Sequence, residues 1–122
     1  MQRVLIIDDH EDTSDFYAHS LRDAYETLIT RYRDDALTAV FEFSPDIVLI
    51  DRRFMRGSNT FVAQMKAIRS DIKLVLISGS DDGEEAAAAM DIFHTMKPIS
   101  GKGLRLLVAN LIKDEQGAVV AS

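Results

Sequence analysis

The chain has 122 residues, 47% of them hydrophobic and 28% charged, which is the size and composition of one soluble globular domain. Because it contains no cysteine, disulfides, thiolate metal ligands and a thiol nucleophile are excluded. The formal net charge of −6 argues against nonspecific binding to nucleic acid or an anionic membrane, since both depend on clustered lysine and arginine. No run approaches the roughly 20 apolar residues of a membrane span, and no signal peptide pattern opens the chain. We therefore expect a cytoplasmic domain with a protein partner.

Short apolar runs alternate with segments of helical spacing along the chain. The runs are nearly continuous rather than alternating, which is typical of parallel strands covered on both faces. This order predicts an α/β fold, a doubly wound five-stranded parallel sheet with helices on both faces. Residues 12–15 offer caps for the first helix and residues 58–60 for the third. The expected strands are 4–7, 26–31, 47–50, 72–77 and 92–95.

Four helical segments have apolar residues on one face, and a fifth, at 84–90, is rich in alanine. Residues 1–115 are predicted to form the domain and residues 116–122 a flexible C-terminal tail. We expect no output domain after it. The apolar positions are Phe16, Tyr17, Leu21 and Ala24; Ala36, Leu37 and Val40; Phe61, Val62, Met65 and Ile68; and Leu104, Leu107, Val108, Leu111 and Ile112.

Polar side chains follow four of the expected strands. Asp8 and Asp9 follow the first, Asp51 ends the third, Ser78 ends the fourth and Lys97 follows the fifth. Parallel strands bring their carboxyl ends to one edge of the sheet, where such folds bind ligands. Three carboxylates in one pocket need a cation, and an all-oxygen donor set suits Mg²⁺. A lysine and a hydroxyl suit a phosphoryl group, so the pattern indicates attack of a carboxylate on phosphorus.

An acidic pair, a single aspartate, a serine and a Lys-Pro pair in this order resemble the receiver domain of two-component response regulators. The resemblance runs from the first strand to the last helix. It implies a flavodoxin-like (βα)5 fold with strand order 2-1-3-4-5. It also implies that Asp51 is the phosphoacceptor, that Ser78 binds a phosphoryl oxygen and that Lys97 pairs with the phosphate. The Lys97-Pro98 bond is usually cis in this family.

The resemblance also implies a metal site and a switch. Mg²⁺ would be held by Asp9 directly, by Asp8 through water, by Asp51 and by the backbone carbonyl of Arg53. The switch would consist of Ser78 and the residue three before the lysine.

That residue is His94, which either turns inward on phosphorylation or is a half-exposed strand-end histidine with no such role. The implied partners are a histidine kinase or phosphotransfer protein and a downstream protein. The downstream protein would bind the face formed by helix 4, strand 5 and helix 5. The domain itself would be a monomer or a phosphorylation-dependent dimer. It would not be an enzyme, but would assist its own phosphotransfer and dephosphorylation.

The chain departs from the family pattern after Asp51. The usual Met-Pro pair is absent, three arginines stand nearby, and Asn59 occupies a position that is commonly glycine. These departures leave open a receiver-like binding module that acts without phosphorylation. An aspartate-nucleophile phosphatase is less well supported, because Arg53 stands where its general acid would be.

A zinc site built from Asp8, Asp9, His10 and His19 is also disfavoured. His10 is expected in the loop before the first helix. His19 is expected on that helix's wet face.

Overall fold

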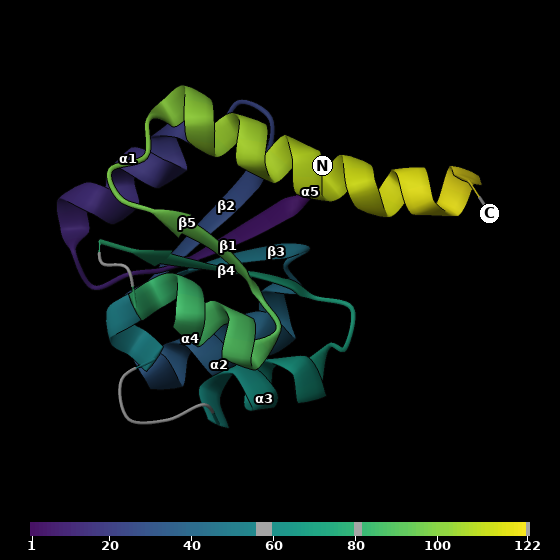
Figure 1. The fold of residues 1–122 in the computed structure, drawn as a ribbon. Helices are drawn as coiled ribbons and strands as arrows, with labels where there is room; N and C mark the ends of the chain where they lie inside the picture. The colour runs from purple at the N-terminus through teal and green to yellow at the C-terminus, as the bar shows by residue number, and fades with distance from the viewer. Residues whose placement is uncertain (56–59, 80–81, 122) are drawn as a thin grey trace.

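The computed structural model describes the backbone of residues 1–55, 60–79 and 82–121, and the side chains of these residues except 55, 82 and 113–121. Five parallel strands form one sheet in the order β2-β1-β3-β4-β5, with helices on both faces (Figure 1). The predicted fold class and strand order are therefore confirmed. The strands are β1 (Arg3–Ile7), β2 (Glu26–Thr30), β3 (Ile47–Asp51), β4 (Lys73–Ser78) and β5 (Phe93–Met96). The helices are α1 (Glu11–Leu21), α2 (Arg33–Phe43), α3 (Thr60–Ile68), α4 (Asp82–Met90) and α5 (Gly101–Ala121), with a short 3-10 helix η1 (Arg52–Met55) after β3.

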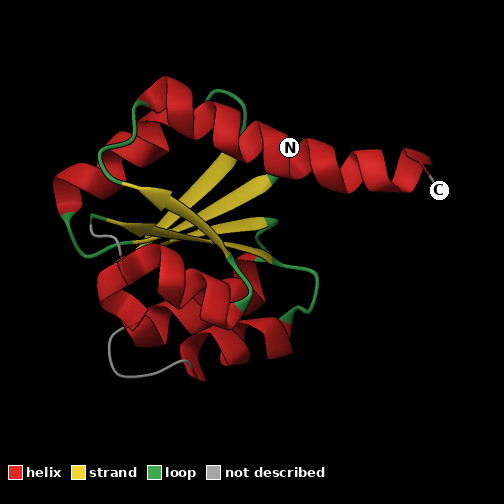
Figure 2. Cartoon of the chain, viewed as in Figure 1, coloured by secondary structure: helices red, strands yellow, loops and turns green. Residues whose placement is uncertain are grey.

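The sheet separates two apolar cores, which explains why its strands are continuous apolar runs. Helices α1 and α5 cover one face, and α2, α3 and α4 cover the other (Figure 2). Leu5 and Ile7 of β1 pack in the core that contains Phe61 of α3. Val4 and Ile6 pack in the other core, beneath α1 and α5. Because both faces of β1 and β3 are buried, their strand ends are fixed in space.

Helix α1 begins earlier than its predicted cap. His10 is the N-cap, and its Nδ1 accepts a hydrogen bond from the Thr13 amide at 3.2 Å. The prediction of a cap at residues 12–15 was wrong, because the chain turns into the helix directly after Asp9. The expected cap at Ser58 and Asn59 lies outside the described residues.

Two positions expected on the apolar face of α1 differ in the structure. Phe16 is 45% exposed, and Ala24 lies beyond the end of the helix. His19 is exposed on α1, as predicted.

Helix α5 is helical through Ala121. The flexible tail expected at residues 116–122 and the domain boundary at 115 stay predictions. None of the helices in the described residues combines the length and the apolar character that a membrane span requires.

Candidate functional site

The carboxyl ends of four strands meet at one edge of the sheet. Asp8 follows β1, Asp51 is the last residue of β3, Ser78 is the last residue of β4 and Lys97 follows β5. The parallel register pairs Asp51 with Ile77, so the residues after these strands emerge side by side. The sheet therefore gathers side chains that are far apart in sequence.

Three carboxylates form an acidic cluster, defined as Asp8, Asp9 and Asp51. One oxygen from each lies within 4.8 Å of the others. Asp8 is 1% exposed and Asp51 is 4% exposed, whereas Asp9 lies at the surface. The structure thus brings together the three aspartates that the sequence singled out.

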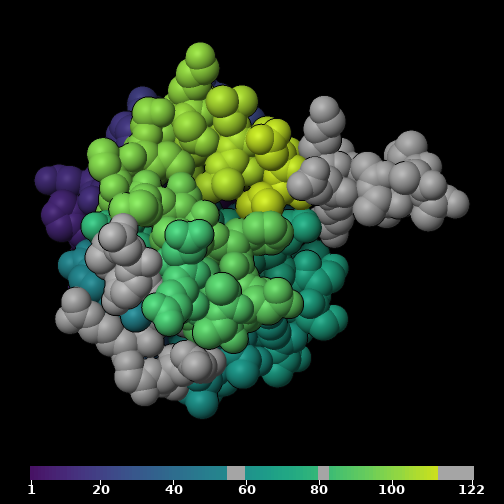
Figure 3. Space-filling model, in the orientation of Figure 1, coloured from purple at the N-terminus to yellow at the C-terminus, as the bar shows by residue number. Residues whose placement is uncertain are grey.

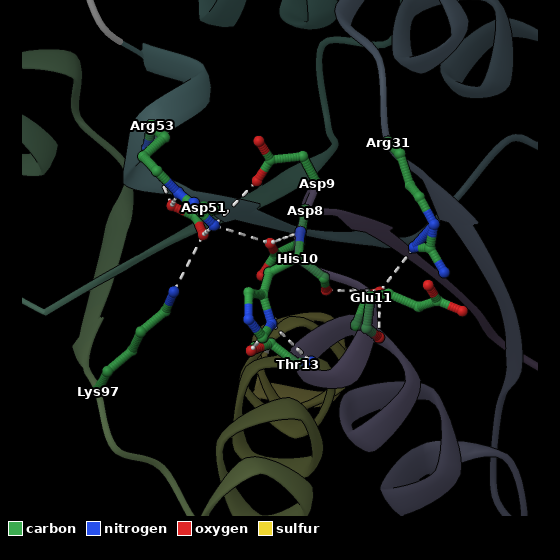
Figure 4. Close-up of polar contacts among 10 residues, drawn as sticks. Asp8, Asp9, His10, Glu11, Thr13, Arg31, Asp51, Arg53 and Lys97 are labelled. Carbon is green, nitrogen blue, oxygen red and sulfur yellow. Dashed lines mark hydrogen bonds and ion pairs between the residues drawn. The ribbon is translucent and has the colours of Figure 1, made fainter.

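Two cations, Lys97 and Arg53, contact the acidic cluster (Figure 4). Lys97 Nζ lies 3.0 Å from Asp51 Oδ2. Arg53 Nη2 lies 2.9 Å from Asp51 Oδ2, 2.9 Å from Asp9 Oδ1 and 3.3 Å from Asp8 Oδ1. The Arg53 amide also donates a hydrogen bond of 2.9 Å to Asp51 Oδ1.

The contact of the Arg53 guanidinium with the acidic cluster was not predicted from the sequence. The only role predicted there for Arg53 is that of a metal ligand through its backbone carbonyl. The available signal was the pair of arginines directly after the central aspartate, because η1 turns the second of them back over the strand end.

Burial and neighbouring charges shift the pKa values of the two buried carboxyl groups in opposite directions. Burial opposes ionisation of Asp51, but hydrogen bonds from Arg53 and Lys97 outweigh it and lower its pKa to about 2. The pKa of Asp8 is raised, chiefly by burial and further by the charge of Asp51. Asp51 is therefore held as an anion, whereas the anionic form of Asp8 destabilises the fold.

Replacing Asp8 by asparagine is expected to raise the free energy of unfolding at neutral pH. A raised folded-state pKa means that the native state loses stability as pH rises above the ordinary value of 3.8. Asparagine removes this loss, so the advantage of the variant should grow with pH and vanish where Asp8 is protonated in both states. Urea unfolding at several pH values measures this difference.

The control for this prediction is Asp9→Asn, which removes the same charge from an exposed position. It should gain no stability, because an exposed ion pair contributes about 0–1 kcal/mol and is lost in this variant. An Asp8→Asn protein no more stable than the original at neutral pH contradicts the prediction.

The two residues expected to form a switch touch each other. Ser78 Oγ lies 2.9 Å from His94 Nε2, and Ser78 is 1% exposed. His94 is half-buried on β5. Gly83 of α4 leaves room for this contact, since a methyl group there would lie 2.6 Å from Ser78 Cβ and 2.8 Å from His94 Nε2. The histidine is therefore linked physically to the edge that carries Asp51.

The donor set of the acidic cluster fits a hard divalent cation. It offers carboxylate oxygens only, and the buried Oδ2 of Asp8 has no hydrogen-bond partner. Mg²⁺ takes one or two carboxylates together with waters and phosphate oxygens.

Among the described side chains, no histidine joins this group. His10 is engaged by Thr13, whose hydroxyl lies 2.9 Å from His10 Nδ1. The Lys97-Pro98 bond is cis, as the resemblance implied.

Comparison with known proteins gives a distant sequence relationship. No family model matches the chain. Over 107 residues the chain is 26% identical to the DNA-binding response regulator MtrA of Mycolicibacterium smegmatis. The match covers 84% of this chain and 47% of MtrA, so the chain spans about half the length of the curated relatives it matches.

Solved structures match the whole fold. A response regulator receiver domain protein (CheY-like) from Methanospirillum hungatei superposes with a TM-score of 0.82 at 17% identity, covering 97% of this chain and 98% of that one. The receiver domain of NtrX from Brucella abortus gives 0.78 at 24% identity, covering 90% and 98%. The BeF3-activated DrrB receiver domain gives 0.81 at 15% identity, covering 93% and 98%.

The chain has the flavodoxin-like fold of receiver domains, with three carboxylates at the strand ends. Together with its similarity to MtrA, this confirms the predicted resemblance to response regulator receiver domains.

Proposed function

We propose that this receiver is switched by phosphorylation of Asp51 in a two-component or phosphorelay system. The observation that carries the proposal is the setting of Asp51, a buried carboxylate held as an anion between Lys97 and Arg53 beside two further carboxylates. A carboxylate oxygen of Asp51 would attack the phosphorus of a phosphohistidine. The phosphorus–nitrogen bond would break, and the imidazole would leave with its electron pair.

The surrounding residues have complementary roles in this proposal. Lys97, now 3.0 Å from Asp51, would pair with the phosphoryl oxygens, and the Ser78 hydroxyl would donate to one of them. Asp8, Asp9, Asp51 and the backbone carbonyl of Arg53 would hold Mg²⁺, which would offset the negative charge of the phosphoryl group. The chain would act as a regulatory phosphoacceptor rather than a classical enzyme. The donor would be a histidine kinase or phosphotransfer protein in the cytoplasm.

The phosphorylation state would be read on the α4-β5-α5 face. A phosphoryl group brings about −2 charge and three acceptor oxygens, which would draw the Ser78 hydroxyl away from His94. Figure 3 shows α4, β5 and the start of α5 as one continuous surface in green to yellow. Phe93, Met96 and Leu106 are 45%, 48% and 54% exposed. Such exposed apolar groups suit a protein partner, or a second copy after phosphorylation.

The test is incubation with acetyl phosphate and Mg²⁺, followed by intact mass measurement. The original chain is expected to gain the mass of one phosphoryl group, and Asp51→Asn is expected to gain none. Removal of Mg²⁺ with a chelator should prevent the gain. An unchanged mass in both proteins, at a metal concentration that saturates the site, would rule the proposal out.

A second candidate is a binding module that acts without phosphorylation. The observation that favours it is the Arg53 guanidinium, which already contacts all three carboxylates of the acidic cluster. This candidate predicts that beryllofluoride with Mg²⁺ leaves the amide spectrum and the affinity for a partner unchanged. The phosphorylation proposal predicts shifts at Ser78 and His94.

A further inference from the structure

We propose that Arg53 is a displaceable internal cation, whose guanidinium takes the place of the metal ion and sets the Mg²⁺ concentration at which the site becomes competent. This inference rests on the proposed function, because it describes how that site is controlled. It concerns the side chain of Arg53 and is independent of the backbone carbonyl assigned above.

The position of one nitrogen carries the inference. Arg53 Nη2 lies within 3.3 Å of an oxygen from each of the three aspartates, and one oxygen of each aspartate lies within 4.8 Å of the others. A Mg²⁺ ion binds oxygen at about 2.0–2.1 Å and demands near-octahedral geometry. The guanidinium and the ion therefore compete for the same three carboxylates.

The surroundings of Arg53 allow the displacement. Its side chain is 45% exposed, whereas Asp8 and Asp51 are buried. The hydrogen bonds and ion pairs described for its guanidinium all go to the acidic cluster. The backbone amide stays bonded to Asp51 at 2.9 Å, so the side chain can turn into solvent while η1 stays in place.

Charge gives the direction of the effect. Arg53 and Lys97 together offset two of the three negative charges of the acidic cluster. Of these two cations, Lys97 alone would remain without the guanidinium, and the carboxylates would attract a divalent ion more strongly. The contact between Arg53 and the carboxylates must be broken before the metal binds. The free energy of that contact therefore weakens metal binding by the same amount.

The experiment is calorimetric titration of Mg²⁺ into the full chain without any phosphodonor. Arg53→Gln is expected to bind Mg²⁺ about tenfold more tightly than the original chain, a factor that corresponds to about 1.4 kcal/mol. Arg53→Lys keeps the positive charge on a side chain that reaches less far. Its Mg²⁺ affinity should therefore lie between those of the original chain and Arg53→Gln. The matched control is Arg22→Gln, which makes the same charge change at an exposed position after α1 and should bind like the original. Circular dichroism verifies that each variant is folded.

A second readout follows the arginine itself. In the original chain, the NMR resonance of the Arg53 side-chain Nε–H should move toward that of a solvent-exposed arginine as Mg²⁺ is added. Equal or weaker affinity in Arg53→Gln would overturn the inference. An Arg53 resonance that does not move at metal saturation would also overturn the inference. So would a failure of both the original chain and Arg53→Gln to bind Mg²⁺.

These outcomes are separable from failure of the proposed function. A chain that shows the predicted metal affinities but gains no phosphoryl mass with acetyl phosphate refutes the phosphorylation proposal and leaves Arg53 as the competing cation. A chain that is phosphorylated although Arg53→Gln binds Mg²⁺ no more tightly refutes the inference alone.

Discussion

Replacing Lys97 by methionine is expected to slow phosphorylation of Asp51 by acetyl phosphate by about 10²- to 10³-fold, the loss typical of removing one preorganised charge-stabilising group. Lys97 Nζ lies 3.0 Å from Asp51 Oδ2, where it can reach an oxygen of a phosphoryl group on that carboxylate. Methionine keeps much of the length and apolar surface of the lysine stem but supplies no charge. The measurement is a mass-spectrometric time course at saturating Mg²⁺.

The matched control is Lys102→Met, which removes the same charge from an exposed position on α5. It should be phosphorylated at the rate of the original chain. If Lys97→Met reacts within a fewfold of the original rate, Lys97 does not stabilise the transferring group. Arg53 would then be the remaining cation in contact with Asp51 among the described residues.

Replacing Gly83 by alanine is expected to destabilise the domain and to break the contact between Ser78 and His94. The added methyl would lie 2.6 Å from Ser78 Cβ, an atom tied to β4, and 2.8 Å from His94 Nε2. Overpacking a buried position costs about 1–3 kcal/mol, while alanine gains about 1 kcal/mol over glycine in a helix. The two effects partly cancel, so we expect a net loss of up to about 2 kcal/mol in the free energy of unfolding, measured by urea denaturation.

Gly79→Ala is the control, because a methyl group there meets no atom within 4 Å. It should leave the free energy of unfolding nearly unchanged. The imidazole resonances of His94 should shift in the Gly83 variant and stay in place in the control. A Gly83→Ala protein of unchanged stability, with unshifted His94 resonances, would show that the three residues do not pack as described.

Much of the fold is predictable because both faces of the sheet are buried. The runs at Val4–Ile7 and Ile47–Ile50 are apolar without interruption, and these residues are buried in the structure. Such runs predict buried strands, and their alternation with helices predicts a parallel sheet. Helix ends were less predictable. The cap of α1 is the ring nitrogen of His10 rather than one of the usual oxygen side chains at residues 12–15.

The candidate site was predictable where it depends on the backbone alone. Asp8, Asp51, Ser78 and Lys97 each stand at or directly after a strand end, so the parallel register brings them together. The direction of a long side chain is not encoded in this way. Arg53 could equally have pointed to solvent, and the turn of η1 together with the negative charge of three carboxylates directs it onto the acidic cluster.

The contact of His94 likewise depends on a distant residue. The sequence placed His94 at a strand end and left two interpretations open. Its bond to Ser78 depends on the missing side chain of Gly83, which belongs to another element. Three-body packing of this kind has no counterpart in local sequence patterns.

The most direct test of the account is to locate the phosphoryl group chemically. Borohydride reduces an acyl phosphate to an alcohol, which converts a phosphorylated aspartate to homoserine that peptide sequencing by mass spectrometry can locate. After treatment with acetyl phosphate and Mg²⁺, the account predicts homoserine at position 51 and at no other aspartate, with none formed when Mg²⁺ is removed. Homoserine at position 8 or 9, or none at all while the metal is bound, would contradict it.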